Sequence, residues 1–449
     1  MNKKRWVLLV ILVIVVFGYI KLFYKTFSVN TVVKTADCIV AFDVKRITNT
    51  LLWNIITTPG QWKTVSFSSG NKDEVSWKDM VKIPDYVLPF HVSGQPAAVW
   101  YLVLQIKDNT DFEKGLRRYH FEKINPAAYA SKDLGISFFK NDNTILITNT
   151  TAANNNYLSN VANELFVKKE YITKQTLLKA IEAKSHLAIY LAANNFLQQA
   201  AVITGNFDKT KIEIKTTLTP NKQFKFTENN FSYTSSSLCA LGFTQPSNTV
   251  YGLLSDSNKN NISKALNFNI DSFLLPSNKY YRLDLTEIKP GVDSAITYLY
   301  DEDFNKIEKV VVNNVREPAY NFNINGDSVR NIYNYFISTN KIEQTDSGKL
   351  FTPMPFVKSY CSIKNEGQLN IVAANYFPGG ADKNSTAVLF LNLLLTKIPK
   401  ELLNYLPGTI TEAITNLESI YLEVLQQNEL LDINCVIQKK KNDLPIIKL

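Results

Sequence analysis

The chain has few of the side chains that carry out most enzyme chemistry. Among its 449 residues there are only three histidines, and they show no paired spacing such as H-E-x-x-H, which brings two imidazoles to one metal ion. The histidines are His91, His120 and His186. The chain also contains no G-x-S-x-G, Walker A or G-x-G-x-x-G motif. It therefore offers no candidate catalytic, cofactor-binding or metal-ligating residue.

Cysteine is scarce as well. The four cysteines form no C-x-x-C pair and stand at Cys38, Cys239, Cys361 and Cys435. They could pair as disulfides in three ways. Three of them, however, alternate with apolar residues as on one face of a strand, as in the segment 38–42. Cysteine on an apolar face usually behaves as a small hydrophobic residue. We therefore expect buried free thiols at Cys38, Cys239 and Cys435.

Three weaker motifs are better explained by local structure. The segment Asn321–Ser328 (NFNINGDS) lacks the early acidic ligands and the Glu at position twelve of a calcium-binding loop. We expect a strand that ends in a turn, with Asp327 capping a helix. The S-x-x-K matches at Ser69–Lys72 and Ser338–Lys341 lack the other elements of a serine acyltransferase site. The acidic run Asp301–Asp303 suits the start of a helix.

Positive charge is concentrated at the two ends of the chain. The net charge is +9, yet five basic residues flank the N-terminal apolar run and three more form Lys439–Lys441. Once those eight are set aside, about +1 remains for the body. A near-neutral body lacks the basic surface that phosphate binding requires, so nucleic acid is not an expected partner. Three lysines are also too few to predict an anionic-membrane contact.

The longest hydrophobic run lies at the N-terminus. Trp6 to Ile20 holds fifteen residues without a charged or strongly polar side chain, and Lys3 to Arg5 precedes it. A bilayer span needs ~20 residues. Lys21 can extend the run by placing its ammonium at the headgroups. We therefore expect residues 1–25 to form a cytoplasmic tip and a transmembrane anchor.

A cleaved signal peptide is the alternative, because it shares the basic start and the apolar centre. Such a signal needs small residues after the apolar run, whereas Phe17 to Phe23 is bulky and partly aromatic. Three basic residues precede the span and two follow it, which favours a cytoplasmic N-terminus. The expected location is that of a single-pass membrane protein with a periplasmic body.

Patterns in the body predict strands, hairpins and helices. Residues 37–44 (DCIVAFDV) predict a buried strand, and residues 61–95, broken by glycine and proline, predict a long loop. Thr110 and Glu113 form a capping-box pattern that predicts a helix. A further helix is expected over residues 196–201, and a hairpin over residues 212–226.

Short segments recur at a nearly constant spacing. CIVAF returns as CALGF after 201 residues, DFEK returns as DFNK after 192, and SHLAIYLA returns as STAVLFLN after about 200. A closing hairpin ends each half. The matched ranges are 38–42 with 239–243, 111–114 with 303–306, and 185–192 with 385–392. Four elements in the same order predict an internal duplication.

The expected fold class is therefore α+β, with a transmembrane helix followed by two similar halves of antiparallel hairpins and packed helices. Its segments are the anchor at 1–25, a spacer at 26–35, halves at 36–235 and 236–440, and a tail at 441–449. In this layout the chain resembles uncharacterised single-pass membrane-anchored bacterial envelope proteins with a duplicated extracytoplasmic region. The resemblance is one of arrangement and implies no site residue or cofactor.

We expect a non-enzymatic binding or structural module that meets a protein or surface partner. Two alternatives stay open. One is a carrier that holds an apolar ligand between the halves, for which the 26 phenylalanines and 22 tyrosines argue. The other is a hydrolase whose site is assembled from distant residues.

Overall fold

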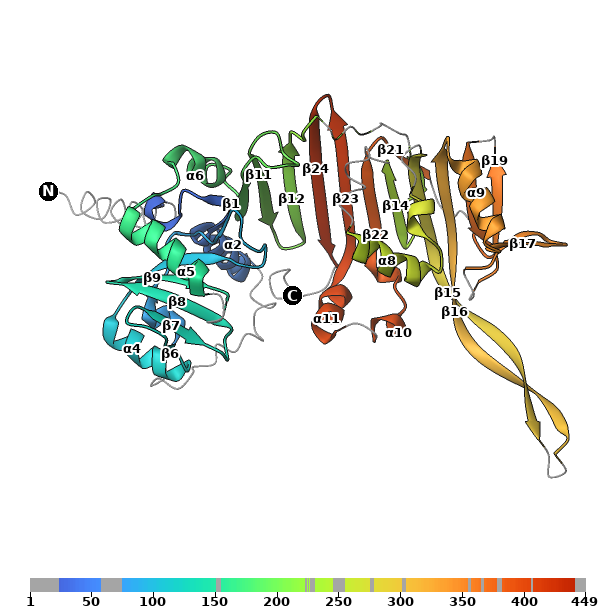
Figure 1. Ribbon diagram of the computed structural model, residues 1–449, viewed down its shortest axis with the longest axis horizontal. Coiled ribbons are helices and arrows are strands. Elements are labelled where there is room, and N and C mark those ends of the chain that lie inside the picture. Colours follow the sequence, from blue (N-terminus) through green and yellow to red (C-terminus); the bar gives the residue numbers. More distant parts are fainter. Residues whose placement is uncertain are drawn as a thin grey trace, which may run out of the picture. The chain divides into compact units, whose positions relative to one another are not determined.

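The computed structural model is dominated by antiparallel sheet, with 46% of residues in strands and 25% in helices (Figure 1). The described residues fall into two compact units that divide between Thr217 and Leu218. The structure describes residues 24–57, 75–150, 155–222, 224, 226, 231–244, 255–274, 278–300, 304–353, 357–364, 367–377, 382–404 and 407–440. The predicted α+β balance of interleaved helices and hairpins is therefore wrong, because strands outweigh helices.

Unit 1 is built on one antiparallel sheet. Its strands are β1 (Ala36–Asp43), β2 (Val81–Lys82), β3 (Tyr86–Val87), β4 (Phe90–Val92), β5 (Tyr101–Ile106), β6 (Glu122–Lys123), β7 (Ala128–Ser131), β8 (Ile136–Asn141), β9 (Thr144–Thr148), β10 (Leu187–Leu191), β11 (Ala201–Phe207) and β12 (Lys211–Leu218). Ten of these described strands lie in the order β12-β11-β10-β1-β4-β5-β9-β8-β7-β6. Short β3 and β2 pair with β1 and β5.

Helices cover both faces of this sheet. They are η1 (Val29–Thr31), α2 (Val44–Thr57), α3 (Trp77–Met80), α4 (Asn109–Arg118), α5 (Asn155–Ala162), the π-helical η4 (Asn163–Lys168) and α6 (Lys174–Ile181). Neighbouring residues of β9 face opposite ways, as strand geometry requires. Leu146 packs with Leu158 of α5 and Leu177 of α6, whereas Ile145 packs with Phe112 of α4.

Unit 2 is also built on antiparallel strands. Its strands are β13 (Phe231–Thr234), β14 (Cys239–Thr244), β15 (Asn278–Tyr300), β16 (Lys306–Gly326), β17 (Ile342–Thr345), β18 (Gly348–Phe351), β19 (Ser359–Lys364), β20 (Gln368–Ala373), β21 (Asp382–Ser385), β22 (Leu389–Leu394), β23 (Leu417–Gln427) and β24 (Leu430–Lys439). Their order is β24-β23-β22-β14-β15-β16-β20-β19-β18-β17, with β13 and β21 forming a separate pair.

The two faces of this sheet are covered differently. The helices of unit 2 are α8 (Asp256–Leu266), η5 (Ile270–Ser272), α9 (Val329–Ser338), η6 (Leu395–Lys397), α10 (Lys400–Leu403) and α11 (Gly408–Asn416). On one face, Phe336 of α9 packs against Ile324 of β16. On the other, Phe231 of β13 packs against Phe390 of β22. A Cβ at Gly242 would lie 2.2 Å from the Phe390 ring, so only glycine permits this close approach.

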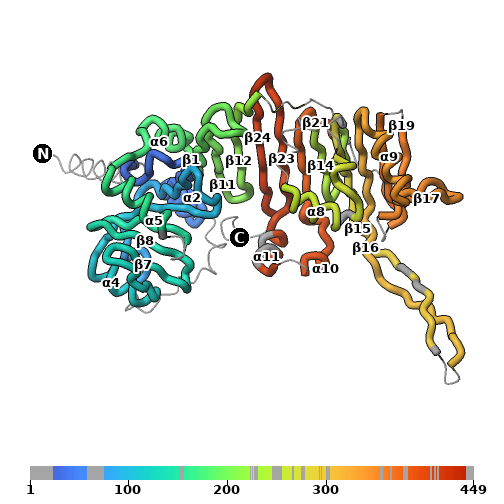
Figure 2. Tube along the Cα trace, viewed as in Figure 1, coloured from blue at the N-terminus to red at the C-terminus, as the bar shows by residue number. Residues whose placement is uncertain are grey.

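β15 and β16 continue together beyond the sheet as a two-stranded extension (Figures 1 and 2). β15 pairs with β14 only over 280–285, and β16 pairs with β20 only over 321–325. Among the described residues, 288–300 and 306–318 pair only with each other. We call these two segments the arm.

The two units share one strand order. β12, β11, β10, β1, β4, β5, β9, β8, β7 and β6 correspond in turn to β24, β23, β22, β14, β15, β16, β20, β19, β18 and β17. The helix α4 follows β5 after the cap residue Asp108, and α9 follows β16 after the cap residue Ser328. Phe112 and Ile332 are each the fourth residue after the cap, and both are buried. The same connectivity therefore occurs twice in the chain.

The predicted equivalence of Phe112 and Phe304 is wrong. Phe304 is 84% exposed, has a positive φ of 61°, and lies at the tip of the arm. Lys306 begins strand β16, and Asp301–Asp303 lie outside the described residues. An acidic run suits the start of a helix, but apolar residues alternate on both sides of this run, which favours a hairpin. The pairing of the two long strands β15 and β16 outweighs the local preference for a helix.

The predicted membrane anchor is corrected too. None of the helices that the structure describes is long and apolar enough to cross a membrane. Residues 1–23 of the expected anchor lie outside the described residues. Lys25, the last residue of the expected anchor, forms an ion pair with Asp43, and the Thr26 amide donates to Asp85 at 2.8 Å. The prediction of a single-pass membrane protein with a periplasmic body is therefore withdrawn.

Three local predictions also fail. The expected loop at 61–95 holds α3, β2, β3 and β4 in its described part, 75–95. The expected helix at 196–201 is a turn, because the Asn194 carbonyl Oδ1 accepts from the amides of Phe196 and Leu197, and β11 then begins. Within the described residues of the expected hairpin at 212–226, β12 pairs with β11, and residues 224 and 226 lie in no strand.

Candidate functional site

An apolar pocket lies in unit 2, on the face of the sheet that α9 covers. Its volume is about 310 Å³. All of its lining residues are apolar or aromatic. They are Phe268, Phe273, Leu283, Leu285, Pro318, Tyr320, Phe322, Phe351 and Ile371.

The floor of the pocket is made by three neighbouring strands. Leu283 and Leu285 of β15 lie directly opposite Phe322 and Tyr320 of β16. Phe322 lies opposite Ile371 of β20. Directly opposed residues of antiparallel strands point to the same face. Period-two alternation in three segments that are distant in sequence thus produces one apolar surface.

Aromatic rings close the pocket from the side of η5. The Phe273 ring stacks on that of Phe322 with centroids 5.5 Å apart, and Phe268 lies 5.2 Å from Phe273. The Tyr281 hydroxyl donates to the Phe273 carbonyl at 2.9 Å, which fixes the backbone that carries the ring. The Tyr281 hydrogen bond and the stacking on Phe322 hold Phe273 in place, so the pocket is largely formed without a ligand.

The polar groups nearest the pocket are already paired. The Tyr320 hydroxyl donates to Ser359 Oγ at 2.7 Å, and burial raises the pKa of this tyrosine. Among the described residues that line the pocket, none carries a charge. A charged ligand would lose its hydration without gaining an ionic partner, which is costly. The pocket therefore suits an uncharged apolar ligand.

The core beneath α4 of unit 1 is filled by a methionine. Met80 of α3 is fully buried beneath α4, in one cluster with Phe112 and Phe138. A Cβ at Gly115 of α4 would lie 2.2 Å from Met80 Sδ, so the thioether lies directly against the helix backbone. Methionine is flexible and fills irregular gaps in cores. The short helix α3 thus supplies a side chain that fills the core beneath α4.

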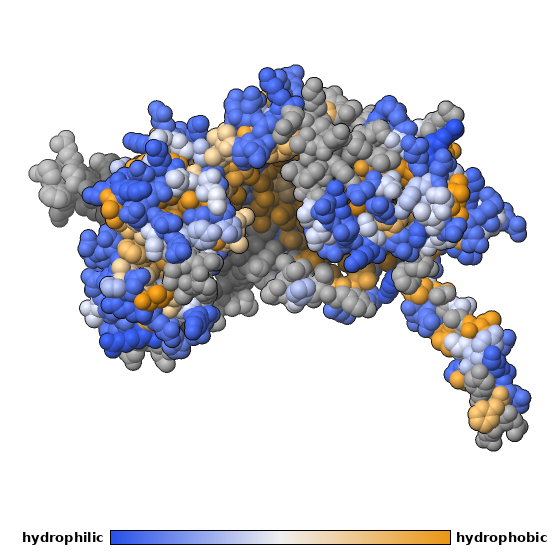
Figure 3. All heavy atoms as spheres, viewed as in Figure 1, coloured by the Kyte–Doolittle hydropathy of each residue, from blue (hydrophilic) through white to orange (hydrophobic). Residues whose placement is uncertain are grey.

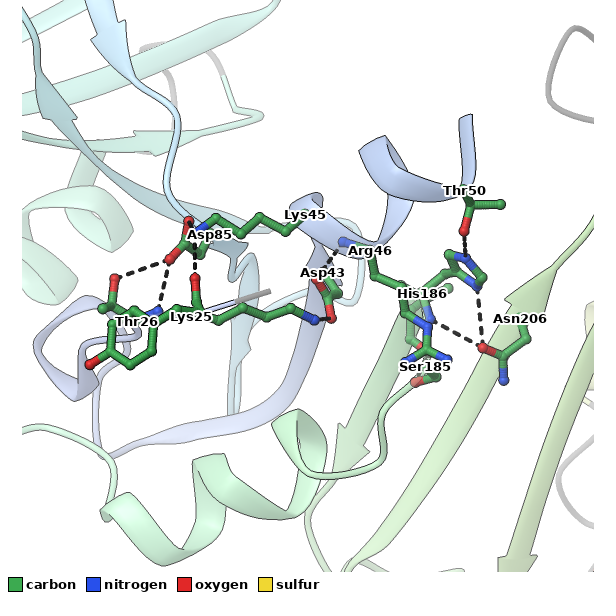
Figure 4. A network of polar contacts seen from close by, with 12 residues as sticks. Lys25, Thr26, Asp43, Lys45, Arg46, Thr50, Asp85, Ser185, His186 and Asn206 are labelled. Atoms are coloured by element: carbon green, nitrogen blue, oxygen red, sulfur yellow. Dashed lines mark hydrogen bonds and ion pairs between the residues drawn. The ribbon is translucent and has the colours of Figure 1, made fainter. Parts of the chain in front are cut away.

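A polar network lies where β1 ends in unit 1 (Figure 4). The buried carboxylate of Asp43 accepts from Lys25 Nζ and, at 2.8 Å, from the Arg46 amide. The Asp43 amide donates to the His186 carbonyl at 3.0 Å. Next to it, Lys45 pairs with Asp85 at 3.1 Å. The network ties the segment before β1 to the start of α2.

His186 is the one histidine in this network. Its Nε2 lies 2.7 Å from Thr50 Oγ1, and its ring stacks on Phe207 with centroids 4.0 Å apart. The His186 Nδ1 atom lies 3.2 Å from the acceptor Asn206 Oδ1. The Phe207 amide also donates to His186 Nδ1, at 3.4 Å. Desolvation, followed by the charge of Arg46, lowers the pKa of His186, so the ring is neutral at pH 7.

The chemistry of this arrangement is limited by the tautomer. In a catalytic triad a carboxylate holds Nδ1–H, which leaves Nε2 free to accept the proton of the nucleophile. At His186 the acceptor Asn206 Oδ1 requires a proton on Nδ1, whereas the donating Phe207 amide requires an unprotonated Nδ1. Thr50 also borders an open groove of about 670 Å³ between α2 and the turn after β11. The contact is therefore a possible nucleophile–base pair without a fixed tautomer.

The other two histidines have separate partners. His91 Nδ1 lies 2.6 Å from Asp37, and His120 Nδ1 lies 2.8 Å from Asp133. In the part of the chain that the structure describes, no three His, Cys, Asp or Glu side chains are grouped to hold a metal ion.

The weak motifs form no site either. The asparagines of NFNINGDS lie on β16, where Asn323 Nδ2 donates to Asn321 Oδ1 at 2.9 Å. The helix after them is capped at Ser328 rather than at the expected Asp327. Ser338 Oγ donates to a carbonyl of its own helix at 3.0 Å, and Ser69–Lys72 lie outside the described residues.

The four cysteines are free thiols, which confirms that expectation. Burial of the three named cysteines was overestimated: Cys38, Cys239 and Cys435 are half-buried, and only Cys361 is buried. On β1 the more buried face is that of Ile39 and Ala41. Both faces of this strand are apolar, so the alternation could not tell which one points to the core.

No protein-family model matches the chain, and no curated protein or solved structure shows significant similarity to it. Sequence reasoning also missed the pocket in unit 2. A signal existed in the alternation of Tyr320, Phe322 and Ile324, but their partners on β15 and β20 become known only when the strands are paired.

Proposed function

We propose that the protein is a non-enzymatic binding module whose unit 2 holds an uncharged apolar ligand in its pocket. The supporting observation is the lining, in which nine apolar or aromatic residues surround about 310 Å³. Ligand pockets in proteins typically measure about 300–1,000 Å³ and are mainly apolar. The proposed ligand lies within unit 2, in contrast to the expectation of a carrier site between two halves.

The driving force is burial of apolar surface, at about 25 cal/mol per Å² removed from water. The stacked rings of Phe273 and Phe322 favour a flat or branched hydrocarbon framework. The ligand class is therefore a small neutral hydrophobic molecule.

A fluorescence titration of the full chain with the neutral probe N-phenyl-1-naphthylamine tests the proposal. We expect enhanced emission with saturable binding. Leu285→Trp fills the pocket and excludes a ring of the probe from it. The probe should then lose over about 1.4 kcal/mol of binding free energy, which weakens its binding by about tenfold or more.

The matched control is Ile337→Trp, on the exposed side of α9, where the side chain is 46% exposed and does not line the pocket. It should bind the probe like the unmodified chain. Equal affinities of the Leu285→Trp and Ile337→Trp proteins, or the absence of saturable binding, would contradict the proposal.

A hydrolase is the second candidate, favoured by the 2.7 Å contact of Thr50 Oγ1 with His186 Nε2 beside a groove. Its test is hydrolysis of p-nitrophenyl acetate by the full chain and by Thr50→Val, which removes the hydroxyl and keeps the shape. We expect equal, background rates because the tautomer of His186 is not fixed. Turnover that depends on Thr50 would replace the binding module with a hydrolase.

A further inference from the structure

A second pocket lies within unit 1. Its volume is about 600 Å³. The segment 26–31, the connection between β2 and β4, strand β5 and the π-helical η4 supply its walls. The segment 26–31 is fixed at both ends, because the Thr26 amide donates to Asp85 and the Ile172 amide donates to the Val32 carbonyl at 3.1 Å. The walls are therefore in place before a ligand binds, which lowers the cost of binding.

This pocket lies where the sheet of unit 1 opens beside β5. Strand β4 pairs with β5 only at Phe90 and Tyr101, and β2 pairs with β5 over residues 81–82 and 105–106. Val103 lies between these two ladders. The register of β4 with β5 places Leu88 opposite Val103, yet the two residues do not pair. Both of them line the pocket, which therefore occupies a break in a hydrogen-bonded ladder.

The break leaves the backbone of Leu88 unpaired. The Pro89 carbonyl accepts from the Val40 amide of β1 at 2.8 Å, so the backbone groups of Leu88, one residue earlier, point the other way, towards β5. Leu88 is 4% exposed, and neither its N–H nor its C=O has a hydrogen-bond partner among the described residues. Buried backbone groups are almost always paired. The pocket therefore suits a ligand that both accepts and donates hydrogen bonds.

Neutral polar side chains surround the same space. The amides of Asn30 and Gln105 and the hydroxyls of Thr144 and Tyr171 line it. Gln105 of β5 and Thr144 of β9 lie directly opposite each other, so they share a face of the sheet. None of these four side-chain groups forms a hydrogen bond within the described part of the chain. Amides and hydroxyls can each donate and accept, so all four are available to a ligand.

The charged groups of the lining do not favour an ionic ligand. The Asp85 carboxylate accepts from the Thr26 amide at 2.8 Å and pairs with Lys45 at 3.1 Å (Figure 4). Lys82 is exposed, where water screens its charge. The ligand that fits this lining is therefore polar but neutral.

Aromatic residues complete the lining of this pocket. They are Phe27, Tyr86, Phe166 and Tyr171. On the face of unit 1 that Figure 3 shows, hydrophilic residues predominate and hydrophobic ones are scattered, so a recess with four aromatic residues differs from that surface. Phe166 belongs to η4, and its ring stacks on Phe139 with centroids 6.0 Å apart. π-Helical turns are rare and occur frequently at functional sites.

Aromatic rings together with neutral hydrogen-bonding groups match a saccharide. The C–H groups of a sugar ring are weakly positive and pack on the negative face of an aromatic ring. Each sugar hydroxyl donates one hydrogen bond and accepts two, which suits the mixed donors and acceptors of this lining. A volume of about 600 Å³ lies within the usual range of small-molecule sites. The lining in unit 2 is apolar or aromatic throughout, so the two pockets suit different ligands.

We propose that this pocket of unit 1 binds a neutral mono- or disaccharide, whose hydroxyls pair with the backbone of Leu88 and with the amides and hydroxyls around it. The site is separate from the apolar site proposed for unit 2. Saturation-transfer NMR of the full chain tests it with glucose, galactose, mannose, N-acetylglucosamine, maltose, cellobiose, lactose and chitobiose, and calorimetry measures the affinity of those that bind. We expect saturable binding of at least one of them.

Two pairs of variants locate the binding. Thr144→Trp fills the pocket and should weaken saccharide binding by about tenfold or more, whereas Asn143→Trp, at the exposed neighbouring residue outside the lining, should leave it unchanged. Gln105→Leu removes one amide and should weaken binding by about two- to tenfold. Gln175→Leu, at an exposed amide in α6 of the same unit, is its control. Equal affinities within both pairs would overturn the proposal.

Hydrogen exchange of the full chain tests the role of Leu88. A saturating concentration of the bound saccharide should slow exchange in the segment 83–92 and leave the lining of the unit 2 pocket unchanged. Protection confined to other segments would overturn the proposal. So would the absence of binding by all eight sugars, which would leave ordered water as the partner of Leu88, or binding of adenosine in their place, which would assign the pocket to a nucleoside.

Discussion

Unit 1 and unit 2 have the same strand order but fill it differently. Beneath α4 of unit 1 the side chain of Met80 occupies the space between helix and sheet, whereas the α9 face of unit 2 retains a pocket of about 310 Å³. The difference comes from the segment before the paired strands. In unit 1 it holds α3, and in unit 2 it holds α8 and η5, and Phe268 and Phe273 on either side of η5 line the pocket.

The opposite faces of the two sheets differ as well. Helices α5 and α6 cover that face in unit 1, and the β13–β21 pair covers it in unit 2. Both coverings lie over a strand that contains a cysteine, Cys38 of β1 or Cys239 of β14. A sheet accepts either layer because both present an apolar surface to it.

The largest difference lies in one hairpin. β4 and β5 pair only at Phe90 and Tyr101, whereas β15 and β16 pair from Asn278 to Tyr300. A hairpin grows at its tip without disturbing the pairs already formed. Unit 2 therefore carries additional surface at the tip of this hairpin, although the strand order of the two units is the same.

Truncation of Phe112 should produce the largest effect, because its side chain is 1% exposed. We expect Phe112→Ala to lower the free energy of unfolding of unit 1 by about 3–5 kcal/mol. Phe304→Ala, at an exposed site of the arm, should change stability by less than about 0.5 kcal/mol. Urea unfolding with hydrogen exchange resolved by unit measures both. Equal losses of unfolding free energy in the Phe112→Ala and Phe304→Ala proteins would contradict this difference between a buried and an exposed phenylalanine.

Removing the filling of unit 1 should make the two units more alike. We expect Met80→Ala to destabilise unit 1 by about 2–5 kcal/mol, since it leaves a cavity beneath α4. The cavity should accept N-phenyl-1-naphthylamine, so the probe stoichiometry should rise from one site to two. Met80→Leu, which retains the volume of the side chain, serves as the control. A stoichiometry that stays at one shows that the space collapses.

A pH dependence should distinguish unit 1 from unit 2. The pKa of His186 in the folded chain is lowered by burial, so the unfolded chain binds the proton more readily. The stability that neutral His186 contributes is present above about pH 6.5 and is lost as the pH falls towards the folded pKa. We expect unit 1 to lose stability between pH 7 and pH 5, and His186→Gln to reduce that loss. An unchanged slope in this variant would assign the loss to other groups.

The smallest expected effect is a difference in the labelling rates of two thiols, which involves no change in the free energy of unfolding. Burial raises the pKa of Cys361 in unit 2 from 9.0 to about 12 and that of Cys38 in unit 1 from 9.0 to about 11. Since the thiolate is the reactive form, both should label slowly at pH 8, and Cys361 more slowly. Mass spectrometry of the native chain with iodoacetamide measures the order. Faster labelling of Cys361 would show that unit 2 opens locally.

Local patterns located many elements correctly. The strand at 37–44 and the helix that contains Phe112 both form. Each is defined by contacts within a few residues, so the alternation or the helical spacing suffices. The helix expected after the segment Asn321–Ser328 also forms, and Val329, Ile332, Tyr333 and Phe336 are buried in it.

Long-range pairing decided the rest. The hairpin tip at Phe304 looked like a helix start, because a capping pattern is local and the register of β15 with β16 is not. The match of CIVAF with CALGF joins strands that hold the same place in the two sheets, whereas that of DFEK with DFNK joins a helix to a hairpin tip. Short segments of strand-like sequence resemble one another by chance.

The sequence by itself determined that the chain is rich in alternating apolar strands and that no catalytic motif is present, and it favoured unpaired cysteines. Only the tertiary structure decided which face of β1 points inward, where Met80 fills a core, and where Phe273 and Phe322 enclose a pocket. The reason is physical. Alternation specifies that two faces differ, but the choice between them, and the volume left between layers, depends on side chains far away in sequence.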